Sequence, residues 1–199
     1  YGLPFDSCHK NAVTSGLVAL TNYYIVVWEC GQDVTNNFIS ATQSKISAFL
    51  TNYGNLFLSG AGIAYSLDRA VGPTVADRAF FNNVLHADLS AEGDTNSATY
   101  NFAALPNTIF QGNANGTIDD GTKGIYWVKS PEVITAYVSG ATPAMYYGAN
   151  FSRHAAIQYD GSAGGGRLVY FGFPFETITN AALRNEYLAD ALNFLDSAP

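Results

Sequence analysis

The sequence predicts one α/β domain with a mostly parallel sheet that helices cover on both faces. Residues 24–28 and 55–58 are almost continuous apolar runs, which are typical of parallel strands buried on both sides. A helical pattern lies between the two runs, and the glycine turn at 59–62 leads from the second run into another helix. Strand, helix, strand, tight turn and helix in this order form the βαβ unit of α/β proteins.

The helix between the two strands is predicted from its ends and from its period. Ser40 stands three residues before Gln43, which is the spacing of a capping box. Gly54 is a typical residue just after the end of a helix. Between these points, apolar residues at helical spacing predict one buried face: Ile46, Phe49 and Leu50.

Two more helices and a region of short strands are expected next. The helices are predicted over 63–67 and 75–85, with Thr74 as the N-cap of the second. From 98 to 159 the pattern changes to short segments that Gly, Asn and Pro interrupt. We interpret four of these segments as antiparallel strands or extensions: 100–102, 108–110, 125–127 and 155–157.

The C-terminal part of the chain predicts one more strand and a closing helix. Residues 167–171 have the pattern of a buried strand, and apolar residues recur at helical spacing over 181–195. No internal repeat or linker separates these elements from the rest of the chain. We therefore expect residues 1–199 to form a single domain.

Composition and charge exclude several classes of function. The chain is 48% hydrophobic and 13% charged, a balance that excludes disorder. A net charge of −7 with only nine Lys and Arg predicts no nucleic-acid partner and no binding to anionic membranes. No apolar run reaches the roughly 18 residues of a membrane span. Scarce Lys, an acidic balance and abundant Asn, Thr, Ser, Gly and Tyr predict an extracellular or periplasmic protein. Because the sequence starts without Met, we expect that the polypeptide has been trimmed.

No metal or cofactor is expected. His9, His86 and His154 show no H-x-H or H-x-x-x-H spacing that would bring two imidazoles together. Asp119-Asp120 lies in a glycine-rich turn and could supply oxygen ligands to Ca²⁺. A calcium loop needs more oxygen ligands at defined intervals, and these are missing.

A binding cleft is expected beyond the carboxyl ends of the parallel strands, because loops converge there in α/β sheets. The loops 6–9, 29–33, 59–62 and 172–176 meet this condition. They predict a cleft lined by Asp6, Ser7, Glu29, Gly31, Asp33, Ser59, Gly60, Ala61, Gly62, Phe173 and Glu176. Four aromatic residues could stack on sugars or belong to the core: Tyr126, Trp127, Tyr146 and Tyr147.

The catalytic candidates in this cleft are Glu29, Ser59 and Glu176. A strand-to-helix turn flanked by glycines presents the nucleophile in several hydrolases, but its tip here is Ala61, which has no nucleophilic atom. Ser59 lies on the strand side of the turn, where it could attack a substrate or form a structural hydrogen bond. The rim carboxylates could perform acid–base chemistry on a glycoside, or could cap helices and turns.

Several segments of the chain, in matching order, resemble one family. They are 5–7, 11–13, 24–31, 56–60, 63–64, 77–85, 119–121, 155–161 and 172–178. The most specific of them is Gly172-Phe173-Pro174-Phe175-Glu176. Over nearly the whole chain they resemble the class I glutamine amidotransferase-like domain of large exported bacterial proteins labelled xanthan lyase or N-acetylmuramoyl-L-alanine amidase. The resemblance implies a flavodoxin-like three-layer sandwich that lacks the family's first strand and helix.

The resemblance also carries an expectation about function. True amidotransferases place Cys at the glycine turn, with His and Glu near the last strand. Here Ala61 stands at the turn, and only Glu176 matches a triad member. The implied function is a non-catalytic amidotransferase-like module that binds carbohydrate or the cell envelope, or acts as a scaffold for neighbouring domains. The alternatives are a hydrolase that acts on a glycan or peptidoglycan amide through strand-end carboxylates, and a purely structural domain.

The two cysteines allow one bridge. Cys8 and Cys30 could pair with each other or could remain as two small buried thiols. Because both are expected at the ends of neighbouring strands, we predict a Cys8–Cys30 disulfide. A free thiol at Cys30 would have a raised pKa beside Glu29, which would make it a poor nucleophile.

Overall fold

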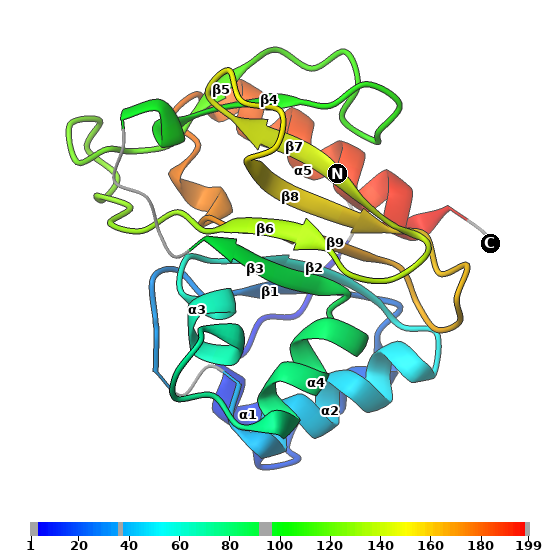
Figure 1. Cartoon of the computed structure of the whole chain (residues 1–199). Coiled ribbons are helices and arrows are strands. Elements are labelled where there is room, and N and C mark those ends of the chain that lie inside the picture. The colour runs from blue at the N-terminus through cyan, green and yellow to red at the C-terminus, as the bar shows by residue number, and fades with distance from the viewer. Residues whose placement is uncertain (1–3, 36–37, 92–96, 198–199) are drawn as a thin grey trace.

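The computed structural model describes residues 4–35, 38–91 and 97–197. Its strands are β1 (Ile25–Glu29), β2 (Asn55–Ser59), β3 (Ala87–Ala91), β4 (Asn101–Ala104), β5 (Gly116–Thr117), β6 (Val133–Ala136), β7 (Ala141–Tyr147), β8 (His154–Tyr159) and β9 (Leu168–Phe171). Seven strands form the main sheet in the order β1-β2-β9-β8-β7-β4-β5 (Figure 1). The remaining two, β3 and β6, form a separate antiparallel pair.

Helices lie on both faces of the main sheet (Figure 1). The helices are α1 (Lys10–Thr14), α2 (Ser40–Thr51), α3 (Ile63–Asp68), α4 (Val75–Asn83) and α5 (Ala181–Asp196), with short 3-10 helices η1 (Leu20–Asn22), η2 (Ser97–Tyr100) and η3 (Phe175–Thr177). Helix α5 packs on one face, whereas α1 to α4 and the β3–β6 pair pack on the other. None of the helices in the described ranges is both long and apolar enough to cross a membrane.

Strand β2 shows how the two faces are filled. All five of its residues are buried. Phe57 points to the α5 side, where its ring packs edge-on against Phe171, with ring centroids 5.1 Å apart. Leu56 and Leu58 point to the opposite side and pack among residues of α2, α3 and α4. Each such side chain contributes about 1.5–3 kcal/mol when it leaves water, so this strand anchors both cores.

The predicted mostly parallel, flavodoxin-like sandwich is wrong. Only β1–β2 and β2–β9 pair in parallel, and the other pairs of the main sheet are antiparallel. The physical reason lies in the connections. Residues 148–153 join β7 to β8 and residues 160–167 join β8 to β9, and both links are shorter than the dozen or so residues of a parallel crossover. The result is a mixed and strongly curled sheet (Figure 1).

Some local predictions also differ from the structure. The capping box at Thr74 is present, because Thr74 Oγ1 accepts from Asp77 N while Asp77 Oδ2 accepts from Thr74 N. Helix α2, in contrast, takes Ile39 rather than Ser40 as its N-cap residue. The segments 108–110 and 125–127 form turns and loops instead of strands. Strands β3, β5, β6 and β7 were not predicted.

Strand β1 is an open edge of the main sheet. Among the described residues it pairs only with β2, through backbone groups of even-numbered residues such as the Cys30 N–H. The N–H and C=O groups of Ile25, Val27 and Glu29 therefore face away from β2. Val27 is 44% exposed, and β1 contains no Lys, Pro or bulge of the kinds that usually protect an edge strand.

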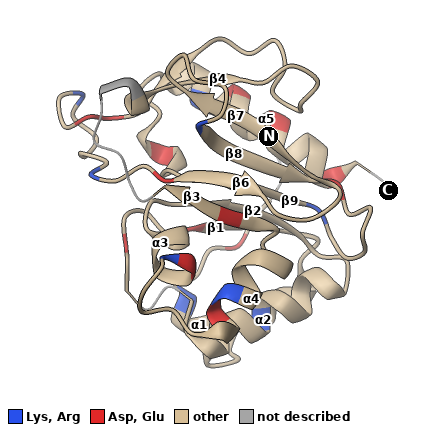
Figure 2. Cartoon of the chain, in the orientation of Figure 1, with Lys and Arg blue, Asp and Glu red and all other residues tan. Residues whose placement is uncertain are grey.

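Charged residues are sparse over the whole fold. Figure 2 shows that most of the ribbon, including most strand residues, carries neither acidic nor basic side chains. Lys and Arg do not gather along any one element in this view (Figure 2). Uncharged polar and aromatic side chains therefore make up most of the surface chemistry available for binding.

Candidate functional site

The carboxyl ends of the three parallel strands meet at one edge of the sheet. Glu29 ends β1, Ser59 ends β2, and the segment 172–176 follows β9. Three of the four predicted loops converge here. In the fourth, Asp6 Oδ2 accepts a hydrogen bond from Tyr23, which precedes β1 and so lies at the opposite end of that strand, at 2.9 Å. Ser7, like Asp6, lies in an exposed segment without regular structure.

Glu176 is the centre of the site. It lies in η3, where Arg184 donates to its backbone oxygen at 2.9 Å. Its Oε1 accepts a hydrogen bond from the Tyr126 hydroxyl, with 2.5 Å between the oxygens. Its Oε2 is buried and has no hydrogen-bond partner among the described residues. A buried carboxylate oxygen without a donor is costly, so it is a natural acceptor for a ligand hydroxyl.

Glu29 faces the same space as Glu176. Glu29 is an exposed residue at the end of β1, but partial desolvation of its carboxyl group raises its pKa, and the negative charge of Glu176 raises it further. Gly31 leaves room between these groups, because a Cβ at this position would lie 3.7 Å from Tyr126 Oη and 3.9 Å from Glu176 Oε1. We call Glu29, Gly31, Tyr126, Trp127 and Glu176 the strand-end rim.

Tyr126 keeps its proton throughout the physiological range. Burial raises the pKa of Tyr126 far above its usual value, and the hydrogen bond and charge of Glu176 add to this effect. The hydroxyl therefore donates to Glu176 rather than accepting from it. Sequence analysis named Tyr126 only as a possible stacking residue. Its role as a hydrogen-bond donor depends on a contact across fifty residues of sequence, which no local pattern indicates.

Asp119 builds the loop that carries Tyr126. Its Oδ1 accepts from the N–H groups of Gly121 and Lys123, at 2.8 and 3.0 Å, and its Oδ2 accepts from Ile125 at 2.7 Å. Burial alone would raise the pKa of Asp119, but these backbone donors outweigh burial and lower it. The carboxylate lone pairs are thus used by the loop itself and are not directed at Ca²⁺.

Trp127 follows Tyr126 in the same loop and packs beside Gly121, where a Cβ would lie 3.1 Å from the Trp127 Cβ. Trp127 is 48% exposed, and its Nε1 donates to the Tyr100 hydroxyl at 2.9 Å. Gln32 holds the backbone on both sides of Val128, donating to Trp127 O and accepting from Lys129 N, each at 2.7 Å. These contacts join the aromatic segment to the loop that follows β1.

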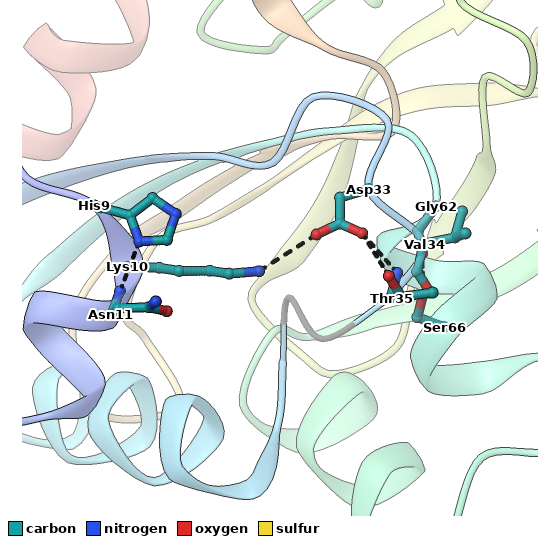
Figure 3. A network of polar contacts seen from close by, with 8 residues as sticks. All are labelled: His9, Lys10, Asn11, Asp33, Val34, Thr35, Gly62 and Ser66. Atoms are coloured by element: carbon teal, nitrogen blue, oxygen red, sulfur yellow. Dashed lines mark hydrogen bonds and ion pairs between the residues drawn. The ribbon is translucent and has the colours of Figure 1, made fainter.

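Asp33 anchors this loop from the other side. Lys10 Nζ lies 3.3 Å from Asp33 Oδ2, and Asp33 Oδ1 accepts from the Thr35 backbone and hydroxyl (Figure 3). Ser66 Oγ donates to Val34 O at 2.8 Å, which ties the loop to α3 (Figure 3). Burial tends to raise the pKa of Asp33, but the Thr35 and Lys10 hydrogen bonds outweigh it and lower the pKa. Asp33 therefore supports the site and does not line it.

Ser59 is a structural residue in this arrangement. It is fully buried, and its Oγ accepts from Phe175 N at 2.7 Å and lies 3.3 Å from Phe173 O. The hydroxyl therefore holds β2 against the segment after β9. Phe173 is likewise buried and packs in the core on the α5 side, away from any solvent-facing cleft.

The Glu132 carboxylate binds the backbone that follows the glycine turn. Sequence analysis did not single out this residue. The Glu132 carboxylate accepts from Ala64 N at 3.0 Å and from Tyr65 N at 2.7 Å, at the start of α3. The Tyr170 hydroxyl donates to it as well, at 3.2 Å. Burial raises the pKa of Glu132 to about 7 in spite of these donors. The backbone N–H groups that could have met a ligand anion are therefore already occupied.

The turn residues themselves are closely packed. A Cβ at Gly60 would lie 2.7 Å from Cys30 Cβ, and one at Gly62 would lie 2.5 Å from a Val34 methyl group. Gly62 also has φ +100°, a conformation that favours glycine. Gly60, Ala61 and Gly62 are buried, so they support the rim instead of lining it.

The predicted Cys8–Cys30 disulfide is wrong, because both cysteines are free. Cys8 lies in an exposed segment that forms no strand, so the two residues do not sit at neighbouring strand ends. Burial raises the pKa of Cys30 to about 12, which keeps its thiol protonated.

The three histidines serve separate structural roles. His9 caps α1 by accepting from Asn11 N at 3.2 Å, and His86 packs on the Tyr159 ring. His154 begins β8. No group of three or more His, Cys, Asp and Glu side chains that could hold a metal ion occurs among the described residues.

Comparisons with known proteins give a fold but not a family. No protein-family model matches the sequence, and no curated protein matches it. Among solved structures, the β-galactosidase of the Antarctic haloarchaeon Halorubrum lacusprofundi is similar, with a TM-score of 0.56 and 13% identity over 90% of this chain and 23% of that chain. The chain shares its fold with part of a β-galactosidase.

Two further β-galactosidases show the same likeness. Gan42B, a GH42 β-galactosidase, gives a TM-score of 0.55 at 12% identity, over 92% of this chain and 23% of that chain. The enzyme from Rahnella sp. R3 gives 0.52 at 15% identity, over 85% of this chain and 21% of that chain. The chain thus spans about a fifth of the length of these β-galactosidases, and identities this low show the fold alone.

These similarities contradict the predicted glutamine amidotransferase-like identity and the non-catalytic module that it implied. The structures with a similar fold are β-galactosidases. The segment that carried the resemblance most specifically has a packing explanation. A Cβ at Gly172 would lie 2.5 Å from Glu132 O, and Phe173 and Phe175 fill the core on the α5 side.

Proposed function

We propose that this chain is a carbohydrate-related domain that binds a neutral glycan at the strand-end rim. The observation that carries the proposal is the buried Glu176 Oε2, which lacks a partner among the described residues; the half-exposed Trp127 follows Tyr126, the residue that holds Glu176. A carboxylate oxygen accepts a sugar hydroxyl, and an indole face packs on a sugar ring. The likeness of the fold to β-galactosidases supports a carbohydrate ligand and makes galactosides the first to test.

The charge of the rim defines the class of sugar. Glu29 and Glu176 place two acidic groups close enough for the charge of one to raise the pKa of the other. A uronic acid or a phosphorylated sugar would add a third negative charge and would be repelled. Hydroxyl groups, in contrast, can donate to either carboxylate, so neutral sugars fit best.

The test is titration of the intact chain with galactose, lactose and longer galactans, followed by tryptophan fluorescence. The chain has two tryptophans, and Trp28 is 7% exposed, so a ligand-dependent change reports on Trp127. Glu176→Gln and Trp127→Ala should each weaken binding by about tenfold or more. Glu186→Gln, an exposed charge on α5, is the matched control and should bind as the parent does. Binding that survives both rim variants would exclude this site.

A hydrolase is the second candidate function, and one observation favours it. Glu29 has a raised pKa beside a second carboxylate, the arrangement that glycosidases use as acid and base. Protonated Glu29 would donate to the glycosidic oxygen while Glu176 accepts a proton from the attacking water. The sugar–oxygen bond breaks, and water supplies the new hydroxyl. Release of reducing ends from galactan, or cleavage of peptidoglycan, that Glu29→Gln abolishes would support hydrolysis, whereas binding without turnover would exclude it.

A further inference from the structure

A polar hollow lies at the other, amino end of β1. It has a volume of about 340 Å³ and is lined by Thr21, Asn22, Tyr23, Tyr24, Phe49, Asn52, Tyr53 and Gly54. It forms where η1 leads into β1 and where α2 ends before β2. No lining residue carries a charge. The volume is at the lower end of the range for small-molecule pockets, which suits about one or two sugar rings.

Phe49 is the purely hydrocarbon side chain among the residues that line the hollow. Phe49 is 1% exposed and lies directly against the backbone of Gly54. A Cβ at Gly54 would lie 2.1 Å from a ring carbon of Phe49, so only glycine allows this approach. The Gly54 N–H also donates to Phe49 O at 3.0 Å, which holds Gly54 against the end of α2.

The edges of the hollow combine aromatic rings with uncharged polar groups. Tyr24 and Tyr53 are 52% and 69% exposed. Asn52 Nδ2 donates to Ala48 O at 2.7 Å, which leaves its Oδ1 to accept from a ligand. The side chain of Asn22 is exposed and makes no hydrogen bond within the described part of the chain, so both ends of its amide are available.

The backbone of Tyr53 is in an unfavourable conformation. Its φ is +62°, in the left-handed region that bulky residues rarely adopt. Gly or Asn would occupy this position with less strain. The conformation belongs to the turn that ends α2, where Tyr53 N donates to Leu50 O and Gly54 N donates to Phe49 O, each at 3.0 Å, so this turn fixes where Tyr53 leaves the helix.

We propose that this hollow binds a neutral saccharide, which stacks on Tyr24 and Tyr53 and exchanges hydrogen bonds with the amides of Asn22 and Asn52. No charged side chain is present to neutralise a phosphate, a carboxylate or an ammonium group. A purely apolar ligand would bury the two amides without partners, which is unfavourable. The site is separate from the strand-end rim, and the inference does not depend on binding there.

The first experiment is a titration of the ¹⁵N-labelled chain, followed by nuclear magnetic resonance. Lactose, cellobiose and maltose are added separately, and at least one should cause saturable shifts of the Asn22 and Asn52 side-chain amides. Galacturonate, which carries a carboxylate, should bind the hollow no more tightly than the neutral disaccharides do. Absence of saturable shifts with all three disaccharides would overturn the proposal, and so would a proline-rich peptide that shifts the same amides when the sugars do not.

Variants then separate binding from folding. Tyr53→Gly removes the ring and relieves the strained backbone, so the chain should melt at the same or a higher temperature while its affinity falls about tenfold or more. Tyr53→Asn should behave in the same way. Tyr137→Ala removes another tyrosine that is 54% exposed and should leave the shifts unchanged. Glu176→Gln should also leave them unchanged, so failure at the rim is distinguishable from failure here. Unaltered affinity in Tyr53→Gly would contradict the proposal.

Discussion

Tyr126 donates a hydrogen bond to Glu176 across fifty residues of sequence, with 2.5 Å between the two oxygens. The contact holds the loop organised by Asp119 against the η3 segment. It also directs the second carboxylate oxygen of Glu176 to a position without a protein donor in the described structure. The geometry of the strand-end rim therefore depends on one hydroxyl group.

Removing that hydroxyl should destabilise the chain. Tyr126→Phe keeps the ring but leaves a half-buried carboxylate oxygen without its donor, and should lower the free energy of unfolding by about 1–2 kcal/mol. Urea denaturation measures the change. Tyr146→Phe is the control, because the Tyr146 ring stacks on Phe151 and its hydroxyl makes no hydrogen bond in the described structure. Equal midpoints for Tyr126→Phe and the parent would show that the contact is unimportant.

The two rim glutamates should titrate in a linked way. Burial is the larger cause of the raised pKa of Glu29, and the charge of Glu176 is the second. Glu176→Gln removes only the second cause, so the pKa of Glu29 should fall but should remain above its usual value. Carboxyl ¹³C titration measures it. A pKa of Glu29 that does not move in the variant would show that the two groups do not interact.

Glu132 should make stability depend on pH. Its pKa is about 7 in the folded chain and near 4.3 in an unfolded one. Protonated Glu132 contributes fully to the stability of the folded chain below its unfolded-state pKa. This contribution is lost as the pH rises through the folded-state pKa, and the loss is on the order of 3 kcal/mol. Glu132→Gln cannot ionise, so its unfolding free energy should fall less than the parent's between pH 4 and 8. His86 and other groups are common to both proteins and cancel in this comparison, and parallel profiles would contradict the assignment.

Asp119 should matter more than its neighbour Asp120. Asp119→Asn exchanges one carboxylate oxygen for an NH₂ group that faces backbone N–H donors, and should cost about 2–3 kcal/mol. The loop that carries Tyr126 should loosen as well, which weakens sugar binding at the rim. Asp120→Asn removes the same charge from an exposed position whose Oδ1 contacts only Thr122, so its change should stay below about 0.5 kcal/mol. Thermal melts of both variants give the comparison, and similar losses would refute it.

Alanine substitutions at Gly54 and Gly16 should show the cost of close packing and the cost of backbone strain separately. Gly54→Ala would force a methyl group into the Phe49 ring and should cost about 2–3 kcal/mol. Gly16 has φ +81° and open space around it, so Gly16→Ala should cost only about 1 kcal/mol of strain. The order of the two melting temperatures tests this difference. A smaller loss for Gly54→Ala would mean that Phe49 can move aside.

The sequence predicted those elements whose signals are local. The apolar runs around Val26 and Leu56 became β1 and β2, and the helical periods around Phe49 and Tyr187 became α2 and α5. Strand direction is not local, because it depends on connection length and on pairing between distant segments. Strand β8 is largely buried, as a parallel strand would be, yet it pairs antiparallel with both neighbours. Burial of both faces therefore did not indicate a parallel sheet.

The site was predicted only in part for the same reason. Glu29 and Glu176 follow strands, so the general position of ligand sites in α/β sheets was enough to find them. Tyr126 reaches Glu176 through a loop that only the Asp119 hydrogen bonds define. Glu132 precedes a strand that was not predicted, and its contacts with Ala64 and Tyr65 span more than sixty residues. No spacing in the sequence indicates such contacts.

The unprotected edge of β1 has a practical consequence for handling this protein. Three residues, Ile25, Val27 and Glu29, offer backbone donors and acceptors to any extended peptide of suitable length. At high concentration a second molecule can supply that peptide, so stored samples should form dimers and larger species through β1. Val27→Lys would place a solvated ammonium group on the open strand, and it is the first change to make when a long-lived monomer is wanted.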